Sequence, residues 1–214
     1  MWPKSFWYNI YEPFIRKAAG FGVASLEPDP DRYEHQYEHC DVLVVGSGPS
    51  GLASALAAAK NGARVILAED KPRFGGSLLT DEVTIGNKKG DEWVADTIEE
   101  LQSMPNVVIK NRSQVFGYYD HNMLVMFERT RDHIQNPTQY TPRQKLWYIR
   151  AKEVIISTGS IERPLVFANN DRPGIMLANS ARKYLNHHSV NLTKKIIKKI
   201  VIFTNNDSAY ELAL

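Results

Sequence analysis

The residues of this sequence that could carry chemistry begin with a glycine-rich hexapeptide, Gly46-Ser47-Gly48-Pro49-Ser50-Gly51. It follows an apolar run over residues 41–45 and precedes a stretch of strong helix formers over residues 49–61. In this context Gly46 allows a tight turn, Gly48 lets the backbone approach a pyrophosphate, and Gly51 lets the helix pack closely on the strand. The helix N-terminus, including Ser50, offers N–H groups and a partial positive charge. The pattern therefore predicts a site for a dinucleotide.

An acidic residue, Glu69, stands where a ribose-binding carboxylate belongs, at the end of the next apolar run over residues 63–69. A carboxylate at this place accepts hydrogen bonds from the adenosine ribose hydroxyls and repels a 2′-phosphate. The pattern favours NAD or FAD over NADP.

Asp70, Lys71 and Ser77, which come after Glu69 in the chain, are further candidates for contacts with the dinucleotide. Asp70 and Lys71 could reach the ribose or the adenine rim, or could simply be exposed charges. Ser77 follows the pair Gly75-Gly76 and offers a hydroxyl donor, with a plain turn as the competing interpretation.

These motifs require a βαβ unit, which the two apolar runs and the intervening helix predict. We expect an α/β fold with a Rossmann-like parallel sheet and an inserted antiparallel β-meander at about residues 114–150, turning at residues 120–122. The other predicted elements are helices over about 90–103 and 177–188 and strands over 107–109, 153–157 and 199–203.

The predicted organisation has three parts. Residues 1–39 contain an aromatic helix, which packs on its own domain or docks on another chain, and a polar linker over residues 27–39. The dinucleotide-binding domain spans residues 40–165. Residues 166–214 begin a second, truncated nucleotide-binding-like domain.

Composition excludes several classes of protein. The 26 Lys and Arg residues nearly balance the 24 Asp and Glu residues, so we expect no nucleic-acid partner. The single cysteine, Cys40, excludes a disulfide framework, a Cys-x-x-Cys redox centre and a zinc site of several thiolates. No apolar run reaches about 18 residues, so we expect no membrane anchor and a cytoplasmic location. His187-His188 is interpreted as a solvated helix end and residues 194–199 as a charged turn, with no metal site.

With these motifs in place, the sequence resembles the two-dinucleotide-binding flavoproteins, the glutathione reductase and thioredoxin reductase superfamily. Within that superfamily it resembles the alpha subunits of heterotetrameric sarcosine oxidases. Three stretches carry the closer resemblance, namely residues 27–35, 162–174 and 204–210.

The resemblance implies an oxidoreductase acting on CH–NH groups, in a complex that oxidises sarcosine to glycine and passes the one-carbon unit to tetrahydrofolate. It implies that the partners are the other chains of that complex, that NAD binds to this domain, and that FMN and FAD lie elsewhere in the complex. The NAD-contacting positions it implies are Ser50, Glu69, Asp70, Lys71, Ser77 and Val115, with Thr158 and Gly159 as further candidates.

The sequence also departs from that family, whose alpha subunits are several times longer, so we expect a fragment that is inactive in isolation. The second strand-turn-helix reads Thr204-Asn205-Asn206-Asp207-Ser208-Ala209, without glycine, and predicts no second nucleotide there. Two alternatives stay open: an FAD-binding portion of a related amine or opine dehydrogenase, and a non-catalytic interaction fragment. No general acid, base or nucleophile occurs at recognisable spacing, so no catalytic residue is named; hydride chemistry would belong to the cofactor.

Overall fold

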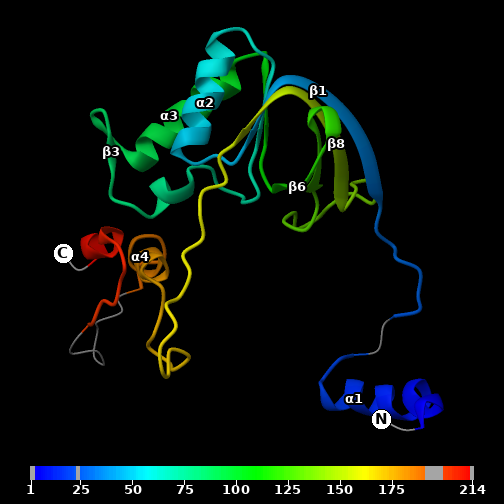
Figure 1. The fold of residues 1–214 in the computed structure, drawn as a ribbon. Coiled ribbons are helices and arrows are strands. Elements are labelled where there is room, and N and C mark those ends of the chain that lie inside the picture. Colours follow the sequence, from blue (N-terminus) through cyan, green and yellow to red (C-terminus); the bar gives the residue numbers. More distant parts are fainter. Residues whose placement is uncertain (1–2, 23–24, 191–199, 213–214) are drawn as a thin grey trace. The chain divides into compact units, whose positions relative to one another are not determined.

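A computed structural model describes residues 3–22, 25–190 and 200–212 (Figure 1). The chain divides into two compact units, Met1–Asp31 and Arg32–Leu214. Each unit is described by itself below.

The first unit is helical, as the spacing of its aromatic residues predicts. A 3₁₀ turn, η1 (Lys4–Phe6), and a π-helical turn, η2 (Trp7–Tyr11), lead into α1 (Glu12–Ala18). A proline in the first turn of α1 and an ion pair between Arg16 and Glu12 favour the helix. Most of the large apolar side chains of this first unit are exposed. Whether this aromatic helix packs on its own domain or docks on another chain stays a prediction.

The second unit is built on a six-stranded sheet in the order β5-β2-β1-β8-β7-β6. Strands β5, β2, β1 and β8 are parallel to one another, whereas β7 and β6 continue the sheet antiparallel. This mixed sheet confirms the predicted α/β fold with an inserted meander. The strands are β1 (Tyr33–Val45), β2 (Val65–Ala68), β5 (Val107–Lys110), β6 (Ser113–Tyr119), β7 (Met123–Arg129) and β8 (Gln144–Ile156), with a separate hairpin of β3 (Thr84–Ile85) and β4 (Lys88–Lys89).

The interpretation of residues 33–39 as a linker is wrong. They form the first half of β1 and pair with residues 144–150 of β8. Their side chains alternate between exposed and half-buried, as in a strand with one covered face. The boundary between the units therefore follows Asp31 instead of residue 39. Likewise, the last part of the expected meander, up to about residue 150, and the strand expected at 153–157 are one continuous strand, β8.

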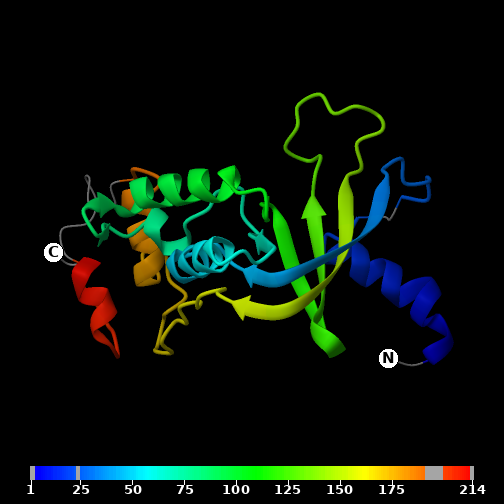
Figure 2. The same cartoon turned by 90° about the horizontal axis from the view of Figure 1, so that it is seen from above.

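Two hydrophobic cores lie on the two faces of the sheet, since they use alternate residues of β1 and β2. Helices α2 (Pro49–Lys60) and α3 (Gly90–Ser103) lie side by side in Figure 2 and pack on one face around Leu52, Leu67 and Leu101. A second core, with Leu43 and Met126 among its fully buried side chains, involves the parallel strands and the meander. Both cores exclude water from the central strands, which explains why β2 is an unbroken apolar run.

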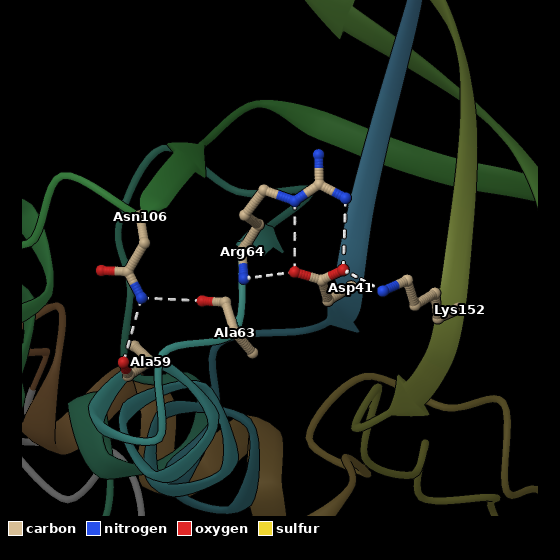
Figure 3. A network of polar contacts seen from close by, with 6 residues as sticks. All are labelled: Asp41, Ala59, Ala63, Arg64, Asn106 and Lys152. Carbon is tan, nitrogen blue, oxygen red and sulfur yellow. Dashed lines mark hydrogen bonds and ion pairs between the residues drawn. The ribbon is translucent and has the colours of Figure 1, made fainter.

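A polar network lies where β2 and β5 begin, beside the middle of β1 and β8 (Figure 3). The Asp41 carboxylate accepts hydrogen bonds from the backbone N–H and guanidinium of Arg64, at 2.9 to 3.2 Å, and forms an ion pair with Lys152 at 2.9 Å. The hydrogen bonds from Arg64, followed by that from Lys152, lower the pKa of Asp41 well below its ordinary value. Nearby, the Asn106 amide donates to two backbone carbonyls at the end of α2 and in the turn that follows, at 3.0 and 2.7 Å.

The C-terminal part contains α4 (Ala178–Asn186), as predicted, and a 3₁₀ helix, η5 (Asp207–Leu212). Glu162 accepts hydrogen bonds from the N-terminal N–H groups of α4, and Arg182 of α4 pairs with Asp81 at 3.1 Å. The predicted strand over 199–203 is wrong for residues 200–203, because no described segment pairs with them; Lys199 lies outside the described residues, as do residues 194–198.

The described residues contain neither a candidate membrane span nor a candidate metal cluster. No helix among them is long and apolar enough to cross a membrane. No group of three or more His, Cys, Asp or Glu side chains in the described ranges could hold a metal ion. The rings of His187 and His188 instead contact one another edge to face.

Candidate functional site

Three loops meet where the parallel strands β2, β1 and β8 end. Residues 46–51 follow β1, residues 69–77 follow β2, and residues 157–159 follow β8. Because the three strands are parallel neighbours, their carboxyl ends lie at the same edge of the sheet, where open α/β folds bind ligands. Backbone hydrogen bonds from Gly46 to Ala68, at 2.8 Å, and from Ser157 to Val45, at 2.7 Å, join the loops to this edge.

The three glycines of the turn have different structural roles. Gly46 has φ +98°, and a Cβ there would lie 2.4 Å from the carbonyl oxygen of Ser157. A Cβ on Gly51 would lie 2.0 Å from the carbonyl oxygen of Gly46. A Cβ on Gly48, by contrast, would meet nothing within 4 Å. Gly46 and Gly51 are therefore required for close packing of the chain, while Gly48 borders open space.

That open space lies at the N-terminus of α2, whose N-cap is Gly48. The first N–H groups of a helix have no partner inside it, and Pro49 has no N–H, so Ser50 and Gly51 carry the free donors of this first turn. Ser50 is exposed. These donors and the helix dipole make the turn suitable for a phosphate.

Glu69 is 6% exposed and its carboxylate faces the glycine turn. Oε2 accepts the backbone N–H of Ser47 at 2.9 Å and its hydroxyl at 2.5 Å, while Oε1 accepts the backbone N–H of Lys71 at 3.1 Å. A carboxylate has about four acceptor positions. Three are taken, which leaves one on Oε1 for a hydroxyl of a ligand. The residues present therefore fit the ribose and pyrophosphate of a dinucleotide.

The charged side chains of Asp70 and Lys71 are exposed beside Glu69. The backbone of this segment is held more firmly than the side chains. The carbonyl of Asp70 accepts a hydrogen bond from the Arg129 guanidinium at 2.7 Å, and the carbonyl of Lys71 accepts the N–H of Arg112 at 3.1 Å.

The remaining predicted positions surround the same edge. Ser77 is exposed in a 3₁₀ turn, η3 (Gly76–Leu79), and a Cβ on Gly76 would lie 2.9 Å from the Cα of Gly48. Thr158 and Gly159 are exposed just beyond β8, and the Thr158 Cα lies 3.3 Å from the position of a Cβ on Gly46. Val115 is different, because it packs against the second core on β6.

A family model described as FAD dependent oxidoreductase matches residues 41–155, from β1 to the end of β8. The chain belongs to the FAD dependent oxidoreductase family. The matched range includes the glycine turn and Glu69, so family membership and the geometry of the site concern the same residues.

Comparison with known proteins confirms the resemblance drawn from the sequence. The chain is 48% identical over 213 residues to the sarcosine oxidase alpha subunit of Rhizobium meliloti (strain 1021), covering 100% of this chain and 21% of that protein. It is 42% identical over 196 residues to its counterpart from Corynebacterium sp. (strain U-96), covering 91% and 20%. The chain thus spans about a fifth of the length of these relatives.

Two more distant similarities agree with these. An opine oxidase protein of Agrobacterium tumefaciens (strain Ach5) is 28% identical over 148 residues, covering 66% of this chain and 28% of that protein. Among solved structures, the L-proline dehydrogenase of P. horikoshii aligns with a TM-score of 0.58 and 24% identity, covering 79% of this chain and 32% of that one, which supports the fold.

Sequence reasoning missed two contributors to this candidate site. Ser47 is fully buried and binds the Glu69 carboxylate, although the motif leaves its position unspecified. Arg129, at the end of β7, binds the backbone at Asp70 and carries no local signal in the sequence.

Cys40 is 3% exposed, and burial, followed by the charge of Glu38, raises its pKa to about 12.

Proposed function

We propose that this chain holds NAD at the carboxyl edge of the sheet, as the dinucleotide-binding portion of a sarcosine oxidase-like alpha subunit. The observation that carries this proposal is the buried Glu69 carboxylate, with one acceptor position left, beside the open space at Gly48. The identity of 48% to a sarcosine oxidase alpha subunit supports the assignment to this kind of oxidase.

Each loop then has a distinct task. The N-terminus of α2, with Ser50, binds the pyrophosphate, and Glu69 accepts a hydroxyl of the adenosine ribose. Asp70, Lys71, Ser77 and Val115 border the adenosine, and Thr158 and Gly159 border the pyrophosphate from the end of β8. A bound nicotinamide or flavin would supply hydride transfer. The residues of this chain bind and orient that group, and none of them is assigned a catalytic role.

FAD is the second candidate, favoured by the description of the matched family. NAD and FAD share the adenosine diphosphate that the glycine turn and Glu69 would bind, so this edge of the sheet suits both. They differ in the half that extends beyond the pyrophosphate.

The wider setting follows from the same relatives. We propose that the chain works with other subunits of a hetero-oligomeric oxidase in the cytoplasm, which converts sarcosine to glycine and passes the one-carbon unit to tetrahydrofolate. FMN and FAD then lie elsewhere in that complex. We also propose that residues 166–214 begin a second domain; the boundary near residue 165 falls in a segment without helix or strand, between β8 and α4.

The test is to purify the chain, record its visible absorption spectrum, denature it by heat and identify any released nucleotide by mass spectrometry. A colourless protein that releases NAD supports the proposal. A yellow protein that releases FAD replaces NAD with FAD at the same site. A protein that releases neither, and binds neither when NAD or FAD is added, refutes the site and favours a non-catalytic interaction fragment.

A further inference from the structure

One side chain of the glycine turn, that of Ser47, is fully buried. Ser47 lies between two glycines, and nothing in the backbone of the turn requires a hydroxyl at this position. The serine hydroxyl instead donates to Oε2 of Glu69 at 2.5 Å. A hydrogen bond from a hydroxyl to a carboxylate at this length is among the stronger ones in proteins.

This hydroxyl decides which oxygen of Glu69 is left for a ligand. The hydroxyl and the backbone N–H of Ser47 both bind Oε2, at 2.5 and 2.9 Å. Two donors fill the acceptor positions of one carboxylate oxygen. Oε1 receives the N–H of Lys71 at 3.1 Å and keeps one position. Without the Ser47 hydroxyl, Oε2 would regain an acceptor position and the carboxylate could rotate toward it.

Ser47 also joins two loops of the site. Its carbonyl accepts the N–H of Gly75 at 3.0 Å, and its hydroxyl oxygen lies 3.4 Å from the same nitrogen. The segment that carries Ser77 is therefore held to the glycine turn through the same residue that holds Glu69.

We propose that Ser47 is the positioning residue of this site and determines its specificity by directing Oε1 of Glu69 at a single ribose hydroxyl. A carboxylate fixed in that orientation opposes a 2′-phosphate at one defined place. This inference rests on the proposed function, because it requires a nucleotide at the edge of the sheet. It adds that a residue which does not touch the ligand sets the discrimination between ligands with and without a 2′-phosphate.

The experiment uses the chain freed of bound nucleotide and two probes, ADP-ribose, which contains the adenosine diphosphate shared by NAD and FAD, and its 2′-phosphate. Dissociation constants are measured by isothermal titration calorimetry for the wild type and for Ser47→Ala. The matched control is Ser113→Ala. Ser113 is equally buried, at 2% exposure, and lies beside the same loop, but its hydroxyl donates to the carbonyl of Asn111 at 2.8 Å and not to Glu69.

We expect Ser47→Ala to weaken ADP-ribose binding about tenfold. The preference for ADP-ribose over its 2′-phosphate should fall by a similar factor. Ser113→Ala should lower the melting temperature to a similar extent and leave both constants unchanged. In a Glu69→Gln background, adding Ser47→Ala should have almost no further effect, because the hydroxyl acts through the carboxylate. If Ser47→Ala does not fold, the second variant is Ser47→Cys, which is somewhat larger, supplies only a weak donor and should give the same losses.

The failure of this inference is distinct from failure of the proposed function. If the wild type binds ADP-ribose and Ser47→Ala keeps both its affinity and its preference, the positioning role is overturned and the site stands. If the effects of Ser47→Ala and Glu69→Gln simply add, Ser47 does not act through Glu69. If the wild type binds neither probe, the proposed function fails and the inference fails with it.

Discussion

Replacing Gly48 by alanine separates ligand binding from folding at this turn. A Cβ at Gly48 would meet nothing within 4 Å, and its φ of −67° suits any residue. Alanine is a poorer N-cap than glycine by roughly 0.5–1 kcal/mol. It also reduces the conformational freedom of the unfolded chain, which stabilises by about 0.4–1 kcal/mol. The two terms nearly cancel, so the melting temperature should change by less than about 2 °C.

Binding should respond quite differently. The methyl group of Gly48→Ala enters the open space where the backbone meets the pyrophosphate, and forced overlap of this kind costs about 1–3 kcal/mol. That corresponds to a loss of affinity of about 5- to 150-fold. The measurements are thermal unfolding by circular dichroism and titration of the nucleotide that the chain releases.

The matched control is Gly51→Ala, in the same turn. Its Cβ would lie 2.0 Å from the carbonyl oxygen of Gly46, where ordinary contacts begin at 3.4 Å. We expect a loss of about 3 kcal/mol and a fall in melting temperature of about 10 °C. If Gly48→Ala loses as much stability as Gly51→Ala does, there is no room for a side chain at Gly48 and the reasoning is refuted. If Gly48→Ala keeps its stability and its affinity, no phosphate lies against this glycine.

Three further predictions address other parts of the second unit. Glu69→Ala should weaken NAD binding about tenfold or more and raise the affinity for NADP relative to NAD; titrations that still show NADP excluded would mean that Glu69 is not the discriminating acid. Because the pKa of Asp41 is lowered in the folded chain by Arg64, its contribution to stability is present above the ordinary carboxyl pKa of about 4 and is lost as the pH falls. The free energy of unfolding measured in urea should therefore be higher for the wild type than for Asp41→Asn at pH 7. This difference should shrink progressively from about pH 5 downward, and a difference that stays constant would contradict the ion pair. With a pKa raised to about 12, Cys40 should react with a thiol reagent at pH 8 at least about 100-fold more slowly in the native chain than in urea; equal rates would show that the thiol is not buried.

The elements with strong local patterns could be predicted from the sequence, and those that depend on a distant partner could not. The βαβ unit, α3 and the meander follow from apolar periodicity and turn residues. Residues 33–39 are polar, and only their pairing with β8 makes them a strand. Residues 200–203 show the opposite case, since they form an apolar run to which no described segment pairs. A hydrogen-bonded neighbour decides both cases, and the local sequence does not encode it.

The same distinction holds within the site. The glycine spacing and the acid at the end of β2 are local signals, and the structure places both at one edge of the sheet. The motif does not distinguish Gly48, which borders open space, from Gly46 and Gly51, which pack against backbone. Nor does the motif reveal that the Ser47 hydroxyl donates a hydrogen bond to Oε2 of Glu69. The contact of Gly46 with Ser157 and that of Ser47 with Glu69 join segments more than twenty residues apart in the chain.

The strand β8 gives the site a connection to the meander that the sequence alone does not suggest. Its first half pairs with β7 and with the start of β1, and its second half is a parallel core strand that ends beside Gly46. Arg129, at the end of β7, binds the backbone at Asp70 from the same meander. The meander therefore supports two of the three loops, through the end of β8 and through Arg129. A packing defect in the meander, such as loss of the fully buried Met126, should consequently disturb nucleotide binding as well as stability. A change in the network around Asp41, which lies where β2 begins and does not contact the three loops, should affect stability alone.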